Sequence, residues 1–108
     1  MTEPTYLVLL ALADTPRHGY GIVQEVLALS DGDVRLGAGT LYGVLDRLVA
    51  AGRIAPERDE VVDGRLRRYY RITEAGSAAA AVETERLAAL ARRARRALAP
   101  RPALGSAG

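Results

Sequence analysis

The chain has 108 residues, which fits one compact domain, and its 49% hydrophobic content supports a buried core. The absence of cysteine excludes disulfides and thiolate metal sites, and the lack of a basic leader or of roughly 18 consecutive apolar residues indicates a cytoplasmic protein without a membrane partner. The net charge of +2 says little about partners, but residues 1–60 contain five arginines and nine acids, whereas residues 61–108 contain ten arginines and four acids.

The N-terminal part of the chain predicts two helices. The first runs from about Pro4 to Ala13, with Thr2 as its cap, and it ends before a Thr-Pro pair. It is apolar nearly all round, so we expect it to be buried on most sides. The second helix begins near Gly19 and ends near Leu29, before a turn rich in Asp, Ser and Gly.

A third helix is predicted over Ala38–Ala51, where Leu41, Leu45 and Leu48 follow helical spacing and form a one-sided core stripe. A glycine follows this helix, in the position that commonly ends one. The preceding segment Val34–Leu36 has a strand-like pattern, and we expect it to add a third strand to the sheet formed by the next segment.

A β-hairpin and a long helix complete the predicted elements. The runs Ile54–Val62 and Arg65–Ile72 are strand-like, and Asp63-Gly64 between them is a strong hairpin signal. Thr73 can cap a final helix that continues to about Leu98.

This order predicts an α+β, mainly helical chain with a winged helix-turn-helix fold, that is, three helices plus a β-hairpin wing. Residues 1–72 form the predicted DNA-binding domain, residues 73–98 a long C-terminal dimerisation helix, and residues 99–108 a flexible tail. In such a fold the third helix enters a major groove of double-stranded DNA and the wing lies against the backbone.

The outer face of the third helix is unusually small and polar. Its residues are Gly39, Gly43, Asp46, Arg47 and Ala50, and it is flanked by Thr40 and Tyr42. Small residues permit close approach of DNA, Thr40 and Tyr42 can donate to phosphates, and Arg47 can reach a phosphate or a guanine edge. An ordinary surface helix of weak propensity is an equal alternative from periodicity alone. Asp46 would repel phosphate, and we expect it to pair with a neighbouring arginine.

The predicted wing concentrates arginine on its second strand, at Arg65, Arg67, Arg68 and Arg71, with only Asp63 as a nearby acid. Strand alternation directs Tyr70 and Ile72 towards the core and Arg67, Tyr69 and Arg71 outward. Gly64-Arg65 at the tip can reach a minor groove. A solvated edge strand is the alternative, but so many arginines favour an anionic partner.

His18, the only histidine, lies beside Tyr20 at the start of the second helix. This helix start can bind a phosphate through its free amides, or His18 can serve as a local cap. A single histidine without cysteine or a suitable pair of acids predicts no metal and no cofactor. No nucleophile–base pair or phosphate loop is recognisable either, so we do not expect an enzyme.

The last helix carries an apolar stripe, formed in its second half by Leu87, Leu90, Ala91, Ala94 and Leu98. Arginines occupy the opposite side. A helix this long must project beyond a three-helix core, and a projecting apolar stripe needs a partner. A second copy of the chain is the economical one, so this stripe is the predicted homodimer interface, while the alanine-rich first half packs on its own domain.

Three strings in order resemble the PadR family of transcriptional regulators: PRHGYGI at 16–22, GTLY at 39–42, and RRYYRITEAG at 67–76. The resemblance implies a homodimeric repressor on a pseudo-palindromic operator, released by a small hydrophobic or phenolic effector. It also implies that Tyr20, Thr40 and Tyr42 contact the DNA backbone and that Gly64-Arg65 forms the wing tip.

Two features depart from the family pattern. Ala38 precedes the GTLY string where members often have Ser or Pro, so the third helix lacks an evident side-chain cap. The chain is also short and has no aromatic residue after Tyr70, which places any effector pocket at the dimer interface.

Overall fold

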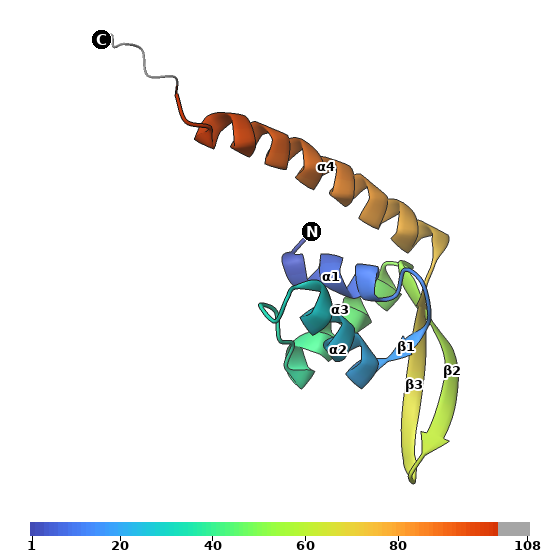
Figure 1. Ribbon diagram of the computed structural model, residues 1–108. Helices are drawn as coiled ribbons and strands as arrows, with labels where there is room; N and C mark the ends of the chain where they lie inside the picture. The colour runs from blue at the N-terminus through green and yellow to red at the C-terminus, as the bar shows by residue number, and fades with distance from the viewer. Residues whose placement is uncertain (102–108) are drawn as a thin grey trace.

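The computed structural model describes residues 1–101. Its elements are α1 (Glu3–Ala11), β1 (Arg17–His18), α2 (Gly19–Leu29), α3 (Ala38–Ala50), β2 (Ile54–Val62), β3 (Arg65–Ile72) and α4 (Glu74–Leu98) (Figure 1). Three helices, a β-hairpin wing and a long final helix form the predicted winged helix, with helix ends within two residues of the expected ones. The predicted flexible tail lies outside the described residues from position 102 onward.

The third strand of the sheet differs from the prediction. The strand order is β1-β3-β2, and Arg17 and His18 pair antiparallel with Tyr70 and Tyr69 of β3. The prediction of a strand at Val34–Leu36 was therefore wrong. That segment is an irregular connection whose apolar side chains pack into the core, and β3 already has a partner on each edge. Burial, and not sheet pairing, produced its alternating pattern.

One apolar cluster connects the helices to the base of the wing. Its buried members are Leu7, Val8, Leu9, Ala11, Leu12, Ile22, Val26, Leu36, Leu41, Val44, Leu45, Leu48, Ile54, Tyr70 and Ala80. As predicted, α1 is buried on most sides, and the leucine stripe of α3 faces inward. The opposite side of α3 is thereby left at the surface, close to the wing.

Four residues join the end of α3, the start of β2 and the start of α4, and we call them the α3–α4 joint: Gly52, Arg53, Thr73 and Gly76. The Thr73 hydroxyl donates to the Gly52 carbonyl at 2.7 Å, and the Thr73 N–H donates to the Arg53 carbonyl at 3.1 Å. Thr73 also caps α4 as predicted, because its Oγ1 accepts from the Gly76 N–H at 3.1 Å. A side chain on Gly76 would collide with the Arg53 carbonyl, so this position requires glycine.

The first half of α4 packs on α1 through small and polar groups. Ala80 and Glu83 are buried, and the Tyr6 hydroxyl of α1 lies 2.6 Å from Oγ1 of Thr84. Two hydrogen bonds from Arg86, at 2.7 and 2.8 Å, satisfy Glu83 and lower the pKa of its carboxyl group. The second half of α4 extends beyond the helical core (Figure 1). No helix within residues 1–101, α4 included, is both long and apolar enough to cross a membrane.

Candidate nucleic-acid interface

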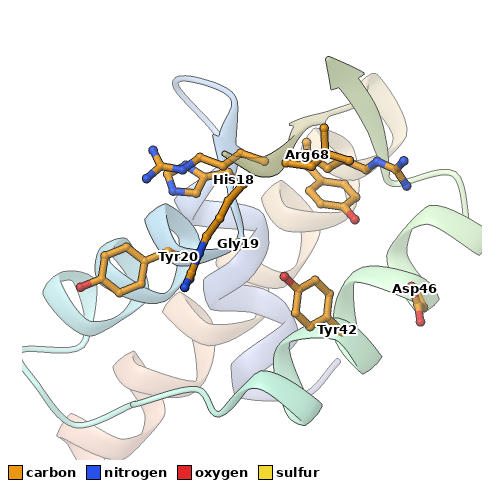
Figure 2. A pocket seen from close by; sticks show the side chains of 10 residues that line it. His18, Gly19, Tyr20, Tyr42, Asp46 and Arg68 are labelled. Carbon is orange, nitrogen blue, oxygen red and sulfur yellow. The ribbon is translucent and has the colours of Figure 1, made fainter. Parts of the chain in front are cut away.

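A groove of about 710 Å³ lies between the start of α2, α3 and the wing, and we call it the wing groove (Figure 2). Its lining residues are His18, Gly19, Tyr20, Tyr42, Asp46, Arg65, Leu66, Arg67, Arg68 and Tyr70. Three segments that are far apart in the sequence therefore meet here. Of the residues predicted to bind DNA, the groove brings together His18, Tyr20, Tyr42, Arg65, Arg67 and Arg68.

The start of α2 contributes an imidazole and a phenol to the groove. His18 occupies the N-cap position, but its side chain makes no capping hydrogen bond, so the local-cap alternative does not hold. Its ring lies 5.2 Å from the Tyr69 ring, and burial, followed by the nearby Arg67 charge, lowers its pKa. His18 is therefore predominantly neutral at pH 7. Tyr20 is two-thirds exposed, and its ring points away from Tyr42 and Arg68 (Figure 2).

A close contact between α2 and α3 positions Tyr42, whose side chain is half exposed and points from α3 towards the start of α2 (Figure 2). A Cβ placed on Gly19 would lie 3.1 Å from the Tyr42 hydroxyl oxygen and 3.4 Å from the Leu41 side chain. Gly19 thus leaves room for the tyrosine at the base of the groove. This role of Gly19 was not predicted from the sequence. Its position between two ring-bearing residues, His18 and Tyr20, was the available sign.

The exposed face of α3 forms a second surface next to the wing groove. Gly39 and Thr40 lie on the first turn and are exposed, as is Arg47, and none of them lines the groove. One Arg47 guanidinium nitrogen lies 3.5 Å from where a Cβ of Gly43 would be, an ordinary van der Waals distance, so the arginine lies along the helix over this glycine. The expected pairing of Asp46 was wrong: no ion pair to it is found within residues 1–101, and it lines the groove. The helix begins without a side-chain cap, as predicted.

The tip of the wing is the tight turn that the Asp-Gly pair predicted. Asp63 and Gly64 have φ angles of 51° and 76°, so both lie in the left-handed region that a two-residue hairpin turn requires. Gly64 and the adjacent Arg65 are exposed at the tip. Arg65 stands opposite Val62 in the register, so no acid faces it across the strands.

The middle of the wing carries less free positive charge than the sequence suggested. Arg68 lies 3.1 Å from Asp59 on the neighbouring strand, and this hydrogen bond raises the pKa of the guanidinium group. Arg58 pairs with Glu57 at 3.1 Å and with Glu60 at 3.8 Å. The expectation that Asp63 was the only acid nearby was wrong, because antiparallel pairing places the acids of β2 directly opposite the arginines of β3.

The two tyrosines of β3 have different environments, as alternation predicted. Tyr70 is buried, and burial raises the pKa of its phenol, while Ile72 packs against the core. Tyr69 is on the opposite face but is not free in solvent. The His18 ring covers it from β1, and the Arg58 guanidinium lies 4.0 Å from its ring centroid, a cation–π contact.

Comparison with known proteins identifies the fold and the family. A family model described as the transcriptional regulator PadR-like family matches residues 8–82, from α1 into α4. The chain belongs to this family. The match covers the whole wing groove and α3, and it ends before the second half of α4. Within residues 1–101, no group of three or more His or acidic side chains is placed to hold a metal ion.

The PadR-like chain is 46% identical over 80 residues to the transcriptional regulator Rv3488 of Mycobacterium tuberculosis, covering 74% of this chain and 71% of that protein. A PadR family transcription regulator from Clostridium difficile has the same fold, with a TM-score of 0.76 and 20% identity over 90% of this chain and 99% of the other. Bacillus subtilis PadR, solved in complex with operator DNA, matches with a TM-score of 0.68 and 19% identity, over 78% of this chain and 47% of that one.

Proposed function

We propose that this PadR-like chain is a transcriptional repressor that binds a pseudo-palindromic DNA operator as a homodimer. The observation that carries the proposal is the wing groove, which gathers His18, Tyr20, Tyr42 and the wing arginines beside an uncrowded helix face. Hydroxyl groups, arginines and free helix-start amides are the groups that contact phosphates. The likeness in fold to Bacillus subtilis PadR, which was solved with operator DNA, supports the same reading.

The proposed contacts divide by surface. The exposed face of α3, with Gly39, Thr40, Gly43 and Arg47, approaches base edges in a major groove, because its small residues allow the backbone of the helix close to the DNA. Tyr20, Tyr42 and the groove arginines face the phosphate backbone. The Gly64-Arg65 tip reaches the adjacent minor groove.

The proposed homodimer rests on the second half of α4. The helix face that packs on α1 through Ala80 and Glu83 continues past the core as Leu87, Leu90, Ala91, Ala94 and Leu98. Leu90 is 51% exposed and Leu98 is 82% exposed in the single chain. A second copy of α4 would cover both leucines and hold two α3 helices one DNA turn apart, roughly 34–36 Å.

Release by a small hydrophobic or phenolic effector is the last part of the proposal. A hollow of about 390 Å³ between α1, the end of α2 and α4 is lined by Tyr6, Leu7, Leu29 and Leu87 together with several polar residues. Its volume is in the range of small-molecule sites, and the exposed half of α4 begins at its edge. Titration of the protein–DNA complex with phenolic acids tests this part, and we expect the complex to dissociate.

The test of DNA binding is a mobility-shift assay on the DNA upstream of the chain's own gene, repeated over a range of salt concentrations. Several phosphate contacts predict a steep linear fall of log affinity with log salt concentration. The competing function is a protein-interaction module that presents its arginines to an acidic protein. Absent or salt-insensitive retention of the DNA would exclude our proposal in favour of that module.

Two sets of variants test the proposed contacts. Arg65→Ala should weaken binding to all DNA sequences, whereas Gly43→Ala and Arg47→Ala should change the preference among sites. Equal effects of both sets on random DNA would contradict this division.

Leu90→Arg tests the dimer, because it puts a charge into the proposed seam and should yield monomers in sedimentation. Ala81→Arg adds the same charge to an exposed position of α4 away from the stripe and should leave the dimer intact. An unchanged profile for Leu90→Arg would place the interface elsewhere.

A further inference from the structure

Two large apolar side chains lie exposed near the tip of the wing. Val61 of β2 is 70% exposed and Leu66 of β3 is 64% exposed, and they stand directly opposite each other in the antiparallel register. Partners in such a register point to the same face of the sheet, so the two side chains form one apolar patch. We call it the tip pair.

The tip pair is too far from the hydrophobic core to be part of it. Tyr70 is the last buried residue of β3 before the wing leaves the core, and Leu66 lies four residues beyond it, about 13 Å at the rise of a β-strand. Figure 1 shows the wing extending away from the helices and from α4. No described part of the chain covers the pair, so it is open to contact with another molecule.

The tip pair also lies on the side of the wing that faces the candidate DNA surface. Leu66, Arg68 and Tyr70 alternate onto one face of β3, and all three line the wing groove together with Tyr42 of α3. The patch is therefore a direct continuation of the wing groove at its outer end.

The charges around the patch favour one kind of occupant. Asp59 holds Arg68 in the middle of the wing, so the groove face there is nearly neutral. At the tip, Arg65 precedes Leu66 on β3, and strand alternation directs its side chain to the other face of the wing. A DNA minor groove matches this combination, because its walls are formed by deoxyribose carbons and its negative potential attracts arginine.

We propose that Val61 and Leu66 contact the deoxyribose walls of a minor groove next to the major groove entered by α3, with Arg65 reaching into the same groove from the other face of the wing tip. The proposal rests on the DNA-binding function proposed above and deepens it. The outer end of the wing then contacts DNA through apolar side chains on one face and the Arg65 cation on the other.

The test compares the double variant Val61→Thr/Leu66→Thr with the wild type on the DNA upstream of the chain's own gene. Threonine keeps a strand preference, so the hairpin should remain folded. We expect an affinity loss of about tenfold with an unchanged salt slope, because apolar contacts release no counterions. Arg65→Ala, in contrast, should reduce the slope by about one per wing.

Hydroxyl-radical footprinting locates the contact, because this reagent attacks deoxyribose in the minor groove. The double variant should lose protection at the outer minor-groove positions and keep it around the central sites. Val82→Thr is the matched control, since Val82 is an equally exposed valine, at 71%, but lies on α4.

Three results overturn the inference. The first is an unchanged affinity and footprint of the double variant while the wild type binds DNA with a steep salt dependence. The second is an equal loss in Val82→Thr, and the third is a changed sedimentation profile of the double variant, which would make the patch a protein contact. Failure of the wild type to bind DNA at all would instead overturn the proposed function, and this inference with it.

Discussion

Asp59→Asn tests whether the wing restrains its own affinity for DNA. Asp59 lies 3.1 Å from the Arg68 guanidinium, which lines the wing groove, so the carboxylate neutralises a cation at the candidate interface. Asparagine has nearly the same size and keeps a hydrogen-bond acceptor, but it removes the negative charge. Arg68 then becomes available to a phosphate, and a charge that repels phosphate disappears. We therefore expect Asp59→Asn to bind DNA more tightly than the wild type and with less sequence preference.

The size of the effect follows from counterion release. Each additional phosphate contact steepens the fall of log affinity with log salt concentration by about 0.9. One new contact per wing gives a slope change of about 1.8 in the proposed dimer, or about a 12-fold difference in affinity over a fourfold change in salt. Stability should hardly change, because the side chains of Arg68 and Asp59 are 54% and 45% exposed and such surface pairs contribute little.

Fluorescence anisotropy with labelled DNA, from about 50 to 200 mM salt, measures the slope for the upstream fragment and for random DNA. Glu85→Gln is the control, because it makes the same change in net charge on exposed α4, away from the wing. A slope equal to that of the wild type, or a steepening that Glu85→Gln reproduces, would refute the reasoning.

Three further variants test single contacts. Gly19→Ala should displace the Tyr42 hydroxyl and weaken DNA binding roughly three- to tenfold, measured as Kd. Gly76→Ala should lower the free energy of unfolding in urea by about 1–3 kcal/mol or more, because its methyl group meets the Arg53 carbonyl. The pKa of His18 is lowered in the folded chain, so on acidification the unfolded chain binds this proton at a higher pH than the folded chain does. The contribution of His18 to the free energy of unfolding is therefore complete above pH 6.5 and is lost as the pH falls below that value. His18→Gln should remove this part of the pH dependence of the urea midpoint.

Each of these variants has its own check. Tyr42→Phe removes the oxygen that Gly19→Ala would displace, so adding Gly19→Ala to Tyr42→Phe should weaken DNA binding much less than it does in the wild type. Gly39→Ala places a methyl group where nothing lies within 4 Å, and it should not destabilise the protein as Gly76→Ala does. An identical pH dependence of stability in the wild type and His18→Gln would show that another group titrates.

The elements that could be predicted are those specified by neighbouring residues. Thr2 and Thr73 cap their helices, the leucines of α3 follow helical spacing, and Asp63-Gly64 forms the hairpin turn. Each of these features depends on a few consecutive positions. The third strand could not be found in this way, because Arg17–His18 is too short to show alternation and exists only through pairing with β3, some fifty residues away.

Part of the set of residues that meet in the wing groove could be predicted from the sequence, but the pairing of their charges could not. Six of the ten groove residues were predicted to bind DNA, from the start of α2, the face of α3 and the arginines of β3, whereas Gly19, Asp46, Leu66 and Tyr70 were not. The pairing of Asp59 with Arg68 was missed because it joins two strands and had to be counted across the hairpin. The Asp63-Gly64 turn fixes the register of this pair, and the bulge between Pro56 and Arg58 lies beyond it. The role of Gly19 was missed for a similar reason, since it depends on how α2 crosses α3.

The α3–α4 joint holds one end of a long arm, the first half of which also rests on α1. From this joint α4 continues for 25 residues, a length of about 37 Å. A tilt of about 10° at the joint therefore displaces the far end of the helix by about 6 Å. In the proposed dimer that displacement changes the distance between the two α3 helices, which must match successive major grooves. A glycine and two backbone carbonyls at one end of this arm, together with the contact to α1, would thus set how well the proposed dimer spans its DNA site.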